Sequence, residues 1–328
     1  MPKISVIIPA YNADKTIEKT IISVLNQTFT DFEIIVINSS SLDLTQDVVN
    51  NIQDNRIRLF TYPKANVAVN RNRGLKYASG EYLSFLDADD LWTPDKLQCQ
   101  YEALQSNPDA AVAYSLTDAI DENDKFLRKF SHDIRTGDVY SNLLLANFVG
   151  SGSNILVRKS ALEEVGGFDE SLTNAHIIDI SLRLAARYNF IAVGKVQILY
   201  RIHPNSMSSN VLGMEKSYLT VIERAFLHEK AASIQNIKRY SIANLYKYLA
   251  YKALENPPDK YNPLQAIYFV LKAIKCDYYL LIKPIVYKAL LKIMLVTLLP
   301  TQLVKKLIKI YPHIYNTSTF MGYAKLNY

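Results

Sequence analysis

A chain of 328 residues is long enough for one large domain and an appended region. Nonpolar residues make up 49% of the chain and charged residues 21%, a balance that argues against long disordered stretches. The two cysteines, Cys99 and Cys276, are far apart and lack neighbouring Cys or His at metal-ligand spacing, which argues against a disulfide framework and a thiolate metal site.

Short nonpolar runs alternate with helical patterns through the first 90 residues. Strands are predicted over residues 4–9, 32–37, 57–62 and 82–86, and helices over residues 16–25, after Asp43 and over residues 68–78. Strands that alternate with helices favour a parallel sheet with helices on both faces. Strands made almost entirely of nonpolar residues suit a sheet that is buried on both sides. The predicted fold class is therefore α/β.

The rest of the chain has two different characters. Residues 94–210 are less regular, with helices predicted over residues 96–104, 160–165 and 177–188, strands over 110–114, 154–157 and 196–200, and a turn at 121–124. From residue 212 onward the pattern is helical, and Pro257, Pro258 and Pro284 divide it into four or five helices.

Charge is distributed unevenly between these parts. Residues 1–210 contain 20 basic and 25 acidic side chains, whereas residues 211–328 contain 17 basic and 6 acidic ones. Two parts with opposite net charge are expected to have different partners. We predict a first domain over residues 1–211 and a basic helical C-terminal region over residues 212–328.

Neither a leader nor a membrane span is evident. The chain enters a predicted strand at Ile4, without the charged and nonpolar segments and cleavage site of a signal peptide. The most nonpolar stretch, residues 278–300, is interrupted by Lys283, Lys288 and Lys292, so a spanning helix is not expected. We therefore expect a cytoplasmic protein.

Polar residues follow three of the predicted strands, in the segments 9–12, 38–43 and 87–90. In open α/β sheets, ligands bind in the crevice outside the carboxyl ends of the strands. Mg²⁺ and Mn²⁺ prefer oxygen ligands, and one or two carboxylates together with substrate phosphates are enough to bind them. Asp87 and Asp89 can both reach such a crevice. A solvated turn is the alternative, but the nonpolar strand directly before these residues favours a metal-diphosphate site.

Three segments carry a resemblance to a known family. SVIIPAYNADKTIEKTIISVLNQTFTDFEIIVIN, RNRGLKYASGEYLSFLDADDLWTPDKL and VGGFDESL resemble glycosyltransferase family 2, whose members have the GT-A fold, and the resemblance covers about residues 3–205. It implies a nucleotide-sugar donor, commonly a UDP- or dTDP-sugar, inversion at the anomeric carbon, and Mn²⁺ or Mg²⁺ as cofactor. It also implies a Rossmann-like, mainly parallel mixed sheet.

The resemblance assigns roles to individual residues. Those implied to line the nucleotide-sugar pocket are Pro9, Tyr11, Asn12, Ser39, Arg71 and Asp87. Asp89 is implied to be the metal ligand, with His203 beside it at the metal or the diphosphate. A guanidinium group suits phosphate oxygens because it forms paired hydrogen bonds. The alternatives are an exposed helix face for Arg71 and a structural role for His203.

The chain departs from the family pattern at two positions. The residue that usually binds the uracil edge is an Asp, and here it is Ser39, whose hydroxyl group accepts hydrogen bonds more weakly. The residue that usually acts as the general base is also an Asp, and here it is Ile177, which cannot take a proton. His176 precedes it and Asp179 follows it.

The second departure leaves three explanations open. His176 could act as a substitute base, because its ordinary pKa of about 6.5 suits that role. Asp179 could orient His176 or act as the base itself. Alternatively, the protein could bind a donor without efficient turnover, and a surface-loop role is the structural alternative for His176.

The C-terminal region has an amphipathic and basic character. Residues 260–328 contain ten Lys and one acidic residue, Asp277. Nonpolar residues at 303, 304, 307, 308 and 311 share one helical face, and lysines at 305, 306 and 309 share the other, as in interfacial helices on anionic lipid. Packing of this face on the catalytic domain is the alternative. No nucleic-acid recognition motif accompanies the positive charge.

These observations favour a hexosyltransferase-like enzyme that transfers a sugar, with inversion, from a nucleotide sugar to an acceptor hydroxyl group in cell-surface or extracellular glycan synthesis. The expected acceptor is a glycan or a lipid-linked saccharide, and peripheral contact with the inner face of the membrane is expected through residues 260–328. A weak or inactive nucleotide-sugar-binding homologue is the alternative. A nucleotidyltransferase is disfavoured because no Gly-rich triphosphate loop follows the first strand.

Overall fold

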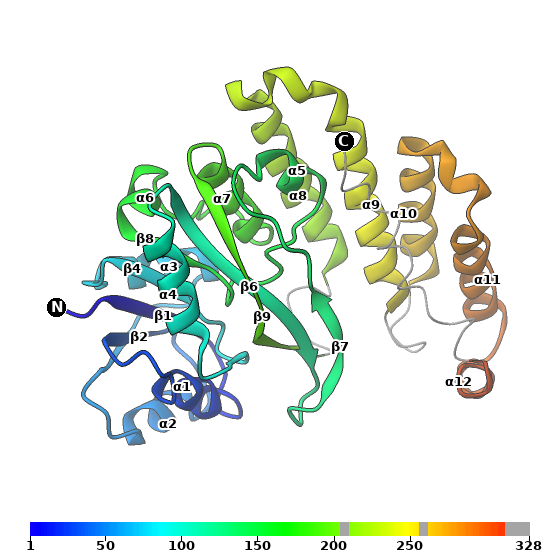
Figure 1. The fold of residues 1–328 in the computed structure, drawn as a ribbon. Helices are drawn as coiled ribbons and strands as arrows, with labels where there is room; N and C mark the ends of the chain where they lie inside the picture. Colours follow the sequence, from blue (N-terminus) through cyan, green and yellow to red (C-terminus); the bar gives the residue numbers. More distant parts are fainter. Residues whose placement is uncertain (204–209, 256–261, 312–328) are drawn as a thin grey trace. The chain divides into compact units, whose positions relative to one another are not determined.

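The computed structural model describes residues 1–203, 210–255 and 262–311. The chain divides into two compact units. The first consists of Met1–Leu143 and Asn147–Pro204, and the second of Leu144–Ala146 and Asn205–Tyr328. The first is an α/β unit and the second is helical (Figure 1).

The α/β unit contains nine strands and seven helices. The strands are β1 (Ile4–Ala10), β2 (Phe32–Asn38), β3 (Ile57–Thr61), β4 (Tyr82–Phe85), β5 (Leu91–Trp92), β6 (Ala110–Ile120), β7 (Phe126–Ser131), β8 (Leu156–Arg158) and β9 (Asn189–Arg201). The helices are α1 (Ile17–Leu25), α2 (Thr45–Asn51), α3 (Val67–Leu75), α4 (Lys96–Ser106), α5 (Tyr140–Leu145), α6 (Lys159–Glu164) and α7 (His176–Ala185), of which α5 runs into the second unit.

The strands form one mixed sheet in the order β3-β2-β1-β4-β8-β6-β9-β5, and β7 pairs with β6. The predicted parallel arrangement is confirmed for β1 to β4. Beyond β4 the sheet is mixed, because β8 runs antiparallel to both β4 and β6 while β6 and β9 are parallel. Since parallel strands end at the same edge, the segments that follow β1, β2 and β4 emerge together.

Both faces of the central strand β1 are covered. Ile4, Val6 and Ile8 pack in a core cluster with residues of α1, α2 and α4. Ile7 points to the opposite face, where Gly74 of α3 lies so close that a Cβ atom would be 2.4 Å from the Cγ2 atom of Ile7. In Figure 1, α1 and α2 lie on one side of β1 and β2 and α3 on the other. Helices therefore cover both faces, as the sequence predicts.

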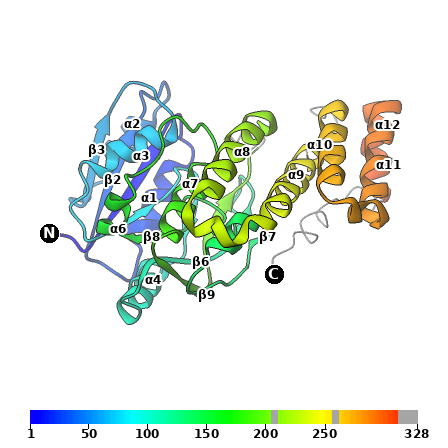
Figure 2. The ribbon, with the colours of Figure 1, turned by 90° about the horizontal axis from the view of Figure 1, so that it is seen from above.

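In the described ranges the second unit consists of α-helices and two 3-10 segments. Its elements are α8 (Val211–Leu227), η2 (Glu229–Ile237), α9 (Lys238–Glu255), α10 (Pro263–Cys276), η3 (Tyr278–Ile282), α11 (Pro284–Leu298) and α12 (Thr301–Ile310). Figure 2 shows α9 and α10 side by side, followed by α11 and α12. Pro284 occupies the first turn of α11, where its missing N–H group costs no hydrogen bond. Pro257 and Pro258 lie outside the described residues. Among the helices in the described ranges, none combines the length and nonpolar character needed to cross a bilayer.

Two lysines are buried inside this helical unit. The Nζ atom of Lys247 lies 2.9 Å from the Oδ2 atom of Asp277, which forms a buried ion pair. Lys292 on α11 donates to the main-chain carbonyl group of Leu254 at the end of α9. Burial lowers the pKa of Lys292 to about 7, the charge of Glu255 counteracts this, and the charge of Lys288 adds to it.

We expect Lys292→Met to stabilise the chain at pH 7 and to flatten its stability profile above that pH. Lys292 takes up a proton near pH 10.5 in the unfolded chain but only near pH 7 in the folded one, so stability falls as pH decreases from about 10 to 7. Between pH 10 and pH 7 this lowers the free energy of unfolding by about 3–5 kcal/mol. Urea unfolding at pH 7 and at pH 9.5 measures it, with the exposed Lys275→Met as control. A parent profile as flat as that of Lys292→Met would contradict this.

Candidate functional site

The loops after β1 and β2 are joined by hydrogen bonds. Asn12, whose φ angle is +50°, accepts a bond from the N–H group of Leu42 through Oδ1 (2.9 Å), and its own N–H group donates to the Oγ atom of Ser41 (3.0 Å). Asn tolerates this left-handed conformation better than most residues. Pro9 is buried within β1, so it shapes the strand end without forming an exposed surface.

Tyr11 presents the exposed ring at this edge. Tyr11 has 38% of its surface exposed, and its hydroxyl group accepts a hydrogen bond from Lys64 at 2.8 Å. The Nζ atom of Lys64 also lies 4.2 Å from the ring centroid, within range of a cation–π interaction. An exposed aromatic face with an adjacent cation is suited to stacking on a flat, electron-rich ligand.

Ser39 is fully buried beneath the same loops. Its Oγ atom accepts a hydrogen bond from the N–H group of Ala65 (2.9 Å) and lies 3.4 Å from the carbonyl oxygen of that residue. The hydroxyl group is therefore already used to hold the segment that leads into α3. A direct contact between Ser39 and a ligand would compete with these bonds.

Arg71 lies in the protein interior and not on an exposed helix face. Its Nη2 atom is 2.6 Å from the Oδ1 atom of Asp87, and its guanidinium group lies 5.9 and 5.4 Å from the ring centroids of Phe85 and Phe168. The Nε and Nη1 atoms are buried and have no hydrogen-bond partner among the described residues. The guanidinium group thus has donors left over for a further acceptor.

The three carboxylates of the segment after β4 have different environments. Asp90 is fully buried, where Ser153 donates to its Oδ2 atom (2.5 Å) and the N–H group of Arg201 to its Oδ1 atom (2.9 Å). Burial raises the pKa of Asp90 well above its usual value, and the charges of Asp89 and Asp87 raise it further. Burial also raises the pKa of Asp87, although the charge of Arg71 opposes it.

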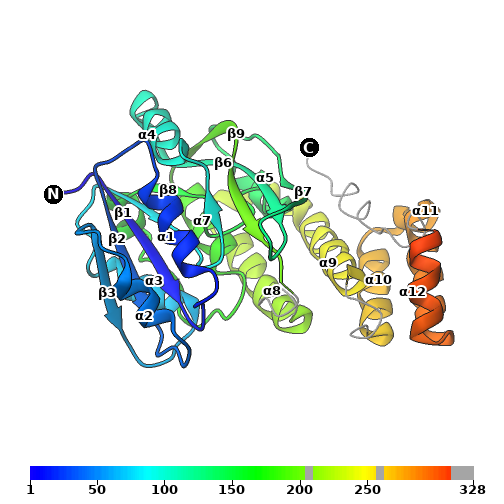
Figure 3. The same ribbon diagram turned by 90° about the horizontal axis from the view of Figure 1, so that it is seen from below.

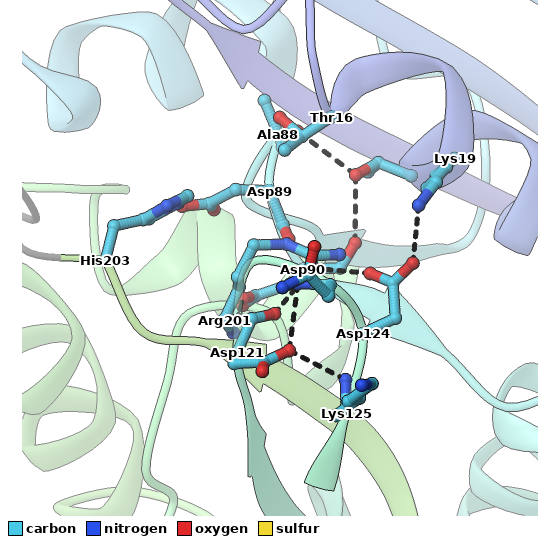
Figure 4. Close-up of polar contacts among 12 residues, drawn as sticks. Thr16, Lys19, Ala88, Asp89, Asp90, Asp121, Asp124, Lys125, Arg201 and His203 are labelled. Carbon is cyan, nitrogen blue, oxygen red and sulfur yellow. Dashed lines mark hydrogen bonds and ion pairs between the residues drawn. The ribbon is translucent and has the colours of Figure 1, made fainter. Parts of the chain in front are cut away.

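Asp89 is the carboxylate of this group that pairs with His203. The Nε2 atom of His203 lies 2.8 Å from the Oδ2 atom of Asp89, and the Asp89 side chain is 36% exposed (Figure 4). The hydrogen bond that the imidazole ring of His203 donates to the carboxylate of Asp89 raises the pKa of the ring. The structure thus brings together two residues, from the segments that follow β4 and β9, that are 114 positions apart.

Arg201 is a structural residue of the site to which the sequence assigned no role. It is buried, its Nε atom donates to the carbonyl oxygen of Asp89 (2.7 Å), and its Nη1 atom lies 2.5 Å from the Oδ1 atom of Asp124 (Figure 4). Asp124 also pairs with Lys19 of α1. Arg201 therefore fixes the backbone of the acidic segment, and its place two residues before His203 was the only indication in the sequence.

Asp89 and His203 offer an oxygen and a nitrogen ligand to a divalent cation. In the described ranges no group of three or more His, Cys, Asp or Glu side chains converges as metal ligands. A cation held jointly with substrate phosphates needs only one or two protein ligands, and hard cations prefer carboxylate oxygen. The partly exposed carboxylate of Asp89, with the Nε2 atom of His203 beside it, fits that requirement.

The start of α7 holds the residues at which a general base was expected. Ile177 is buried. His176 is also buried, and the Nδ1 atom has no hydrogen-bond partner within the described part of the chain. Burial lowers the pKa of His176 well below its usual value, and the positive charge of Arg71 lowers it further. His176 is therefore neutral at pH 7 and is not the surface-loop residue of the structural alternative.

Asp179 belongs to a different set of contacts. Its Oδ2 atom accepts hydrogen bonds from the Nε and Nη2 atoms of Arg183, at 2.9 and 2.6 Å. Arg183 also donates to the carbonyl groups of Val165 and Gly167. Asp179 therefore anchors α7 to the preceding turn, and among the described residues it makes no hydrogen bond to His176.

Gly152→Ala is expected to disturb the Arg71 site. A Cβ atom at this position would lie 2.1 Å from the Nη2 atom of Arg71 and 3.0 Å from the Cδ1 atom of Ile177. Because the guanidinium group is buried and paired, it cannot move without breaking its ion pair, so we expect a loss of about 2–3 kcal/mol. Thermal and urea unfolding measure it. Gly194→Ala, where the nearest atom is 3.7 Å away, should change stability by less than about 0.5 kcal/mol. Equal effects of the two changes would contradict the close approach.

The fold and the acidic strand-end segment define a GT-A-type α/β protein, and comparison with known proteins gives the same class. The family model described as glycosyltransferase-like family 2 matches residues 5–253. The chain therefore belongs to this glycosyltransferase family.

Two relatives and one solved structure illustrate the similarity. The chain is 30% identical over 246 residues to the Escherichia coli UDP-Glc:alpha-D-GlcNAc-diphosphoundecaprenol beta-1,3-glucosyltransferase WfgD, covering 75% of this chain and 94% of that protein. It is 30% identical over 324 residues to the GalNAc(5)-diNAcBac-PP-undecaprenol beta-1,3-glucosyltransferase of Campylobacter jejuni subsp. jejuni, covering 94% and 98%. Residues 1–349 of S. aureus TarS, in complex with UDP-GlcNAc, match with a TM-score of 0.63 at 18% identity, covering 94% of this chain and 92% of that one. The last similarity concerns the fold.

Proposed function

We propose that this protein transfers a sugar from a UDP- or dTDP-sugar to a hydroxyl group of a lipid-linked or polysaccharide acceptor, with inversion at the anomeric carbon. The observation that carries the proposal is the pairing of Asp89 with His203 at the carboxyl ends of β4 and β9, beside the ion pair of the buried Arg71 with the partly exposed Asp87. Similarity to two glucosyltransferases that act on diphosphoundecaprenol-linked saccharides supports this class of acceptor.

The residues have separate roles in this proposal. The exposed ring of Tyr11 stacks on the nucleobase, and Asn12 holds the loop that shapes the pocket. The Nε and Nη1 atoms of Arg71, which have no partner within the described part of the chain, donate hydrogen bonds to the diphosphate. Asp87 keeps the guanidinium group in place.

Asp89 and His203 would hold Mn²⁺ or Mg²⁺. When bound, the cation supplies positive charge that stabilises the departing nucleoside diphosphate. Asp90 and Arg201 keep the backbone of Asp89 in position for this task. In an inverting transfer the acceptor hydroxyl group attacks from the face opposite the leaving group, so its proton goes to a base on that face.

His176 is the residue that we propose to accept this proton. Its imidazole ring is neutral at pH 7, its Nδ1 atom is unpaired in the described structure, and it occupies the start of α7 next to Ile177. If so, His176→Gln should lower kcat by about 100-fold or more, the range of one general base. Because the pKa of His176 is depressed, the parent enzyme should keep its activity well below pH 6.5. Parent-like kcat in His176→Gln, with Asp89→Asn inactive, would exclude the substitute base.

A donor-binding protein with little or no turnover is the second candidate. Two observations favour it: Ile177 offers no proton acceptor, and burial makes His176 a weak base. In that case donors and nucleotides bind at the same site without release of product.

The experiment that separates these candidates is a transfer assay with the purified full chain. UDP- and dTDP-sugars are supplied with Mn²⁺ and an undecaprenyl-diphosphate-linked saccharide, and nucleoside diphosphate release and product linkage are recorded. Transfer with inverted configuration at the anomeric carbon is expected for at least one donor. Retained configuration would contradict inversion, and binding without product over the whole panel would favour the second candidate.

A further inference from the structure

We propose that η3, α11 and α12 form a docking surface for an anionic lipid bilayer. The feature that points to it is an exposed nonpolar stripe along α11, separate from the face by which α11 packs into the helical unit. The stripe consists of Tyr287, Leu290, Leu291, Met294 and Leu298. These residues follow one another at helical spacing, so they line one side of the helix.

The opposite side of α11 is the packed one. It consists of Ile285, Val286, Ala289, Lys292 and Ile293, all of which are buried. An amphipathic helix of a soluble protein usually has one nonpolar face, and that face is buried. α11 has two nonpolar faces. The residues of the second face, the stripe, are each between 37% and 71% exposed. Exposed nonpolar surface of this extent marks an interaction site.

The stripe continues into η3. The hydroxyl group of Tyr287 donates to the carbonyl oxygen of Leu281 at 2.7 Å, which joins the first residue of the stripe to η3. Tyr278, Tyr279 and Ile282 of η3 are exposed, and the Nζ atom of Lys283 lies 4.2 Å from the ring centroid of Tyr279. Tyrosines beside lysines are typical of protein surfaces at the depth of lipid headgroups.

The next helix, α12, also carries nonpolar residues and lysines, on different sides of the helix. Leu303, Leu307 and Ile310 share one side of α12, while Lys305, Lys306 and Lys309 are exposed around it. Figure 3 shows α11 and α12 next to each other, and contacts between them support this. Val304 on the nonpolar side of α12 is buried, whereas Leu303 and Ile310 on that side are exposed.

The positive charge of this region favours an anionic partner. Residues 262–311 contain eight lysines and one acidic residue, Asp277, which is buried and paired with Lys247. No acidic side chain is therefore exposed between 262 and 311. A second copy of the chain would bring lysines against lysines across a two-fold axis, which is unfavourable. An anionic lipid surface instead attracts each lysine and accepts the nonpolar stripe.

Vesicle binding by the full chain tests the proposal, without donor or acceptor present. We expect the chain to bind phosphatidylcholine vesicles that contain phosphatidylglycerol, and to bind pure phosphatidylcholine at least tenfold more weakly. Leu290→Glu with Met294→Glu should weaken binding by about tenfold or more. Lys305→Gln, Lys306→Gln and Lys309→Gln together should weaken it by about 100-fold, since each lysine contributes about fivefold.

The matched control is Leu212→Glu with Leu264→Glu. It removes two exposed nonpolar residues and adds two negative charges in the same helical unit, at first turns where Glu is well tolerated. We expect it to change vesicle binding by less than about threefold, since it lies off the stripe. Equal losses in the two double variants, or no vesicle binding by the parent, would overturn the proposal. So would sedimentation that shows a parent dimer separated by the stripe variant, because a second copy would then cover the stripe. Failure of the transfer reaction would leave all these results unchanged.

Discussion

Arg71→Met is expected to lower the free energy of unfolding by about 3–5 kcal/mol and to abolish transfer. The change leaves the carboxylate of Asp87, whose side chain is 30% exposed, without its charge partner, while partial burial already raises the pKa of that group. It also removes the two unpaired donors proposed to face the diphosphate. Urea unfolding measures the first effect and nucleoside diphosphate release the second.

Two controls separate the role of the buried pair from a general effect of removing arginine. Arg187 forms an exposed ion pair with Glu164, so Arg187→Met should cost less than about 1 kcal/mol. Arg71→Met combined with Asp87→Asn should recover part of the lost stability but none of the activity, because no carboxylate at position 87 is then left without a partner. A stability loss in Arg71→Met no larger than that in Arg187→Met would contradict the structural role assigned to this pair.

Asp89→Asn is expected to reduce kcat/KM by about 100- to 1000-fold while stability stays within about 0.5 kcal/mol of the parent. The Asp89 side chain is partly exposed. Its main-chain carbonyl group accepts a hydrogen bond from Arg201, and this bond remains after the change. The expected loss of kcat/KM is therefore due to removal of the carboxylate charge that would hold the cation. Steady-state kinetics with increasing Mn²⁺ measure it.

Asp109→Asn is the matched control, since it makes the same change at an exposed carboxylate directly before β6. It lies at the amino end of its strand, away from the strand ends that carry the site. We expect parent-like kinetics from it. Activity in Asp89→Asn equal to that of Asp109→Asn would show that the carboxylate at position 89 takes no part in the reaction.

The alternation of elements in the first 90 residues could be predicted because each strand and helix there has its own periodicity. β1 to β4 and the three helices between them follow the predicted ranges within a few residues. β5, β7 and α5 were not predicted, since β5 has two residues, β7 is a largely exposed edge strand and α5 is a six-residue helix. Short or exposed elements form through tertiary contacts and leave little pattern in the sequence.

The candidate site shows a similar division. Asp89 and His203 were proposed together from the family resemblance, and the structure places them in contact. The burial of Arg71 could not be predicted, because a charge on a helix is ordinarily solvated and its enclosure depends on Phe85, Phe168 and Gly152 from other elements. The pairing of Asp179 with Arg183 has the i,i+4 spacing of a helical ion pair, whereas the family resemblance suggested Asp179 as a partner of His176 or as the base itself.

The departures at positions 39 and 177 are explained differently by the structure. Ser39 is integrated into the fold through its bonds to Ala65, so its hydroxyl group has a structural use. Ile177 packs close to Gly152, beside the buried guanidinium group of Arg71. The nonpolar side chain is compatible with that packing, and His176, directly before it, is the residue that we propose as proton acceptor.

The most direct test of the central claim is calorimetric titration of the full chain with UDP and dTDP in the presence of Mn²⁺. If the strand-end site holds a nucleoside diphosphate, at least one of the two nucleotides binds to the parent and to Asp109→Asn with equal affinity. Binding to Asp89→Asn should then be weakened by at least about tenfold. No heat of binding from either nucleotide, or equal binding by Asp89→Asn, would contradict the account.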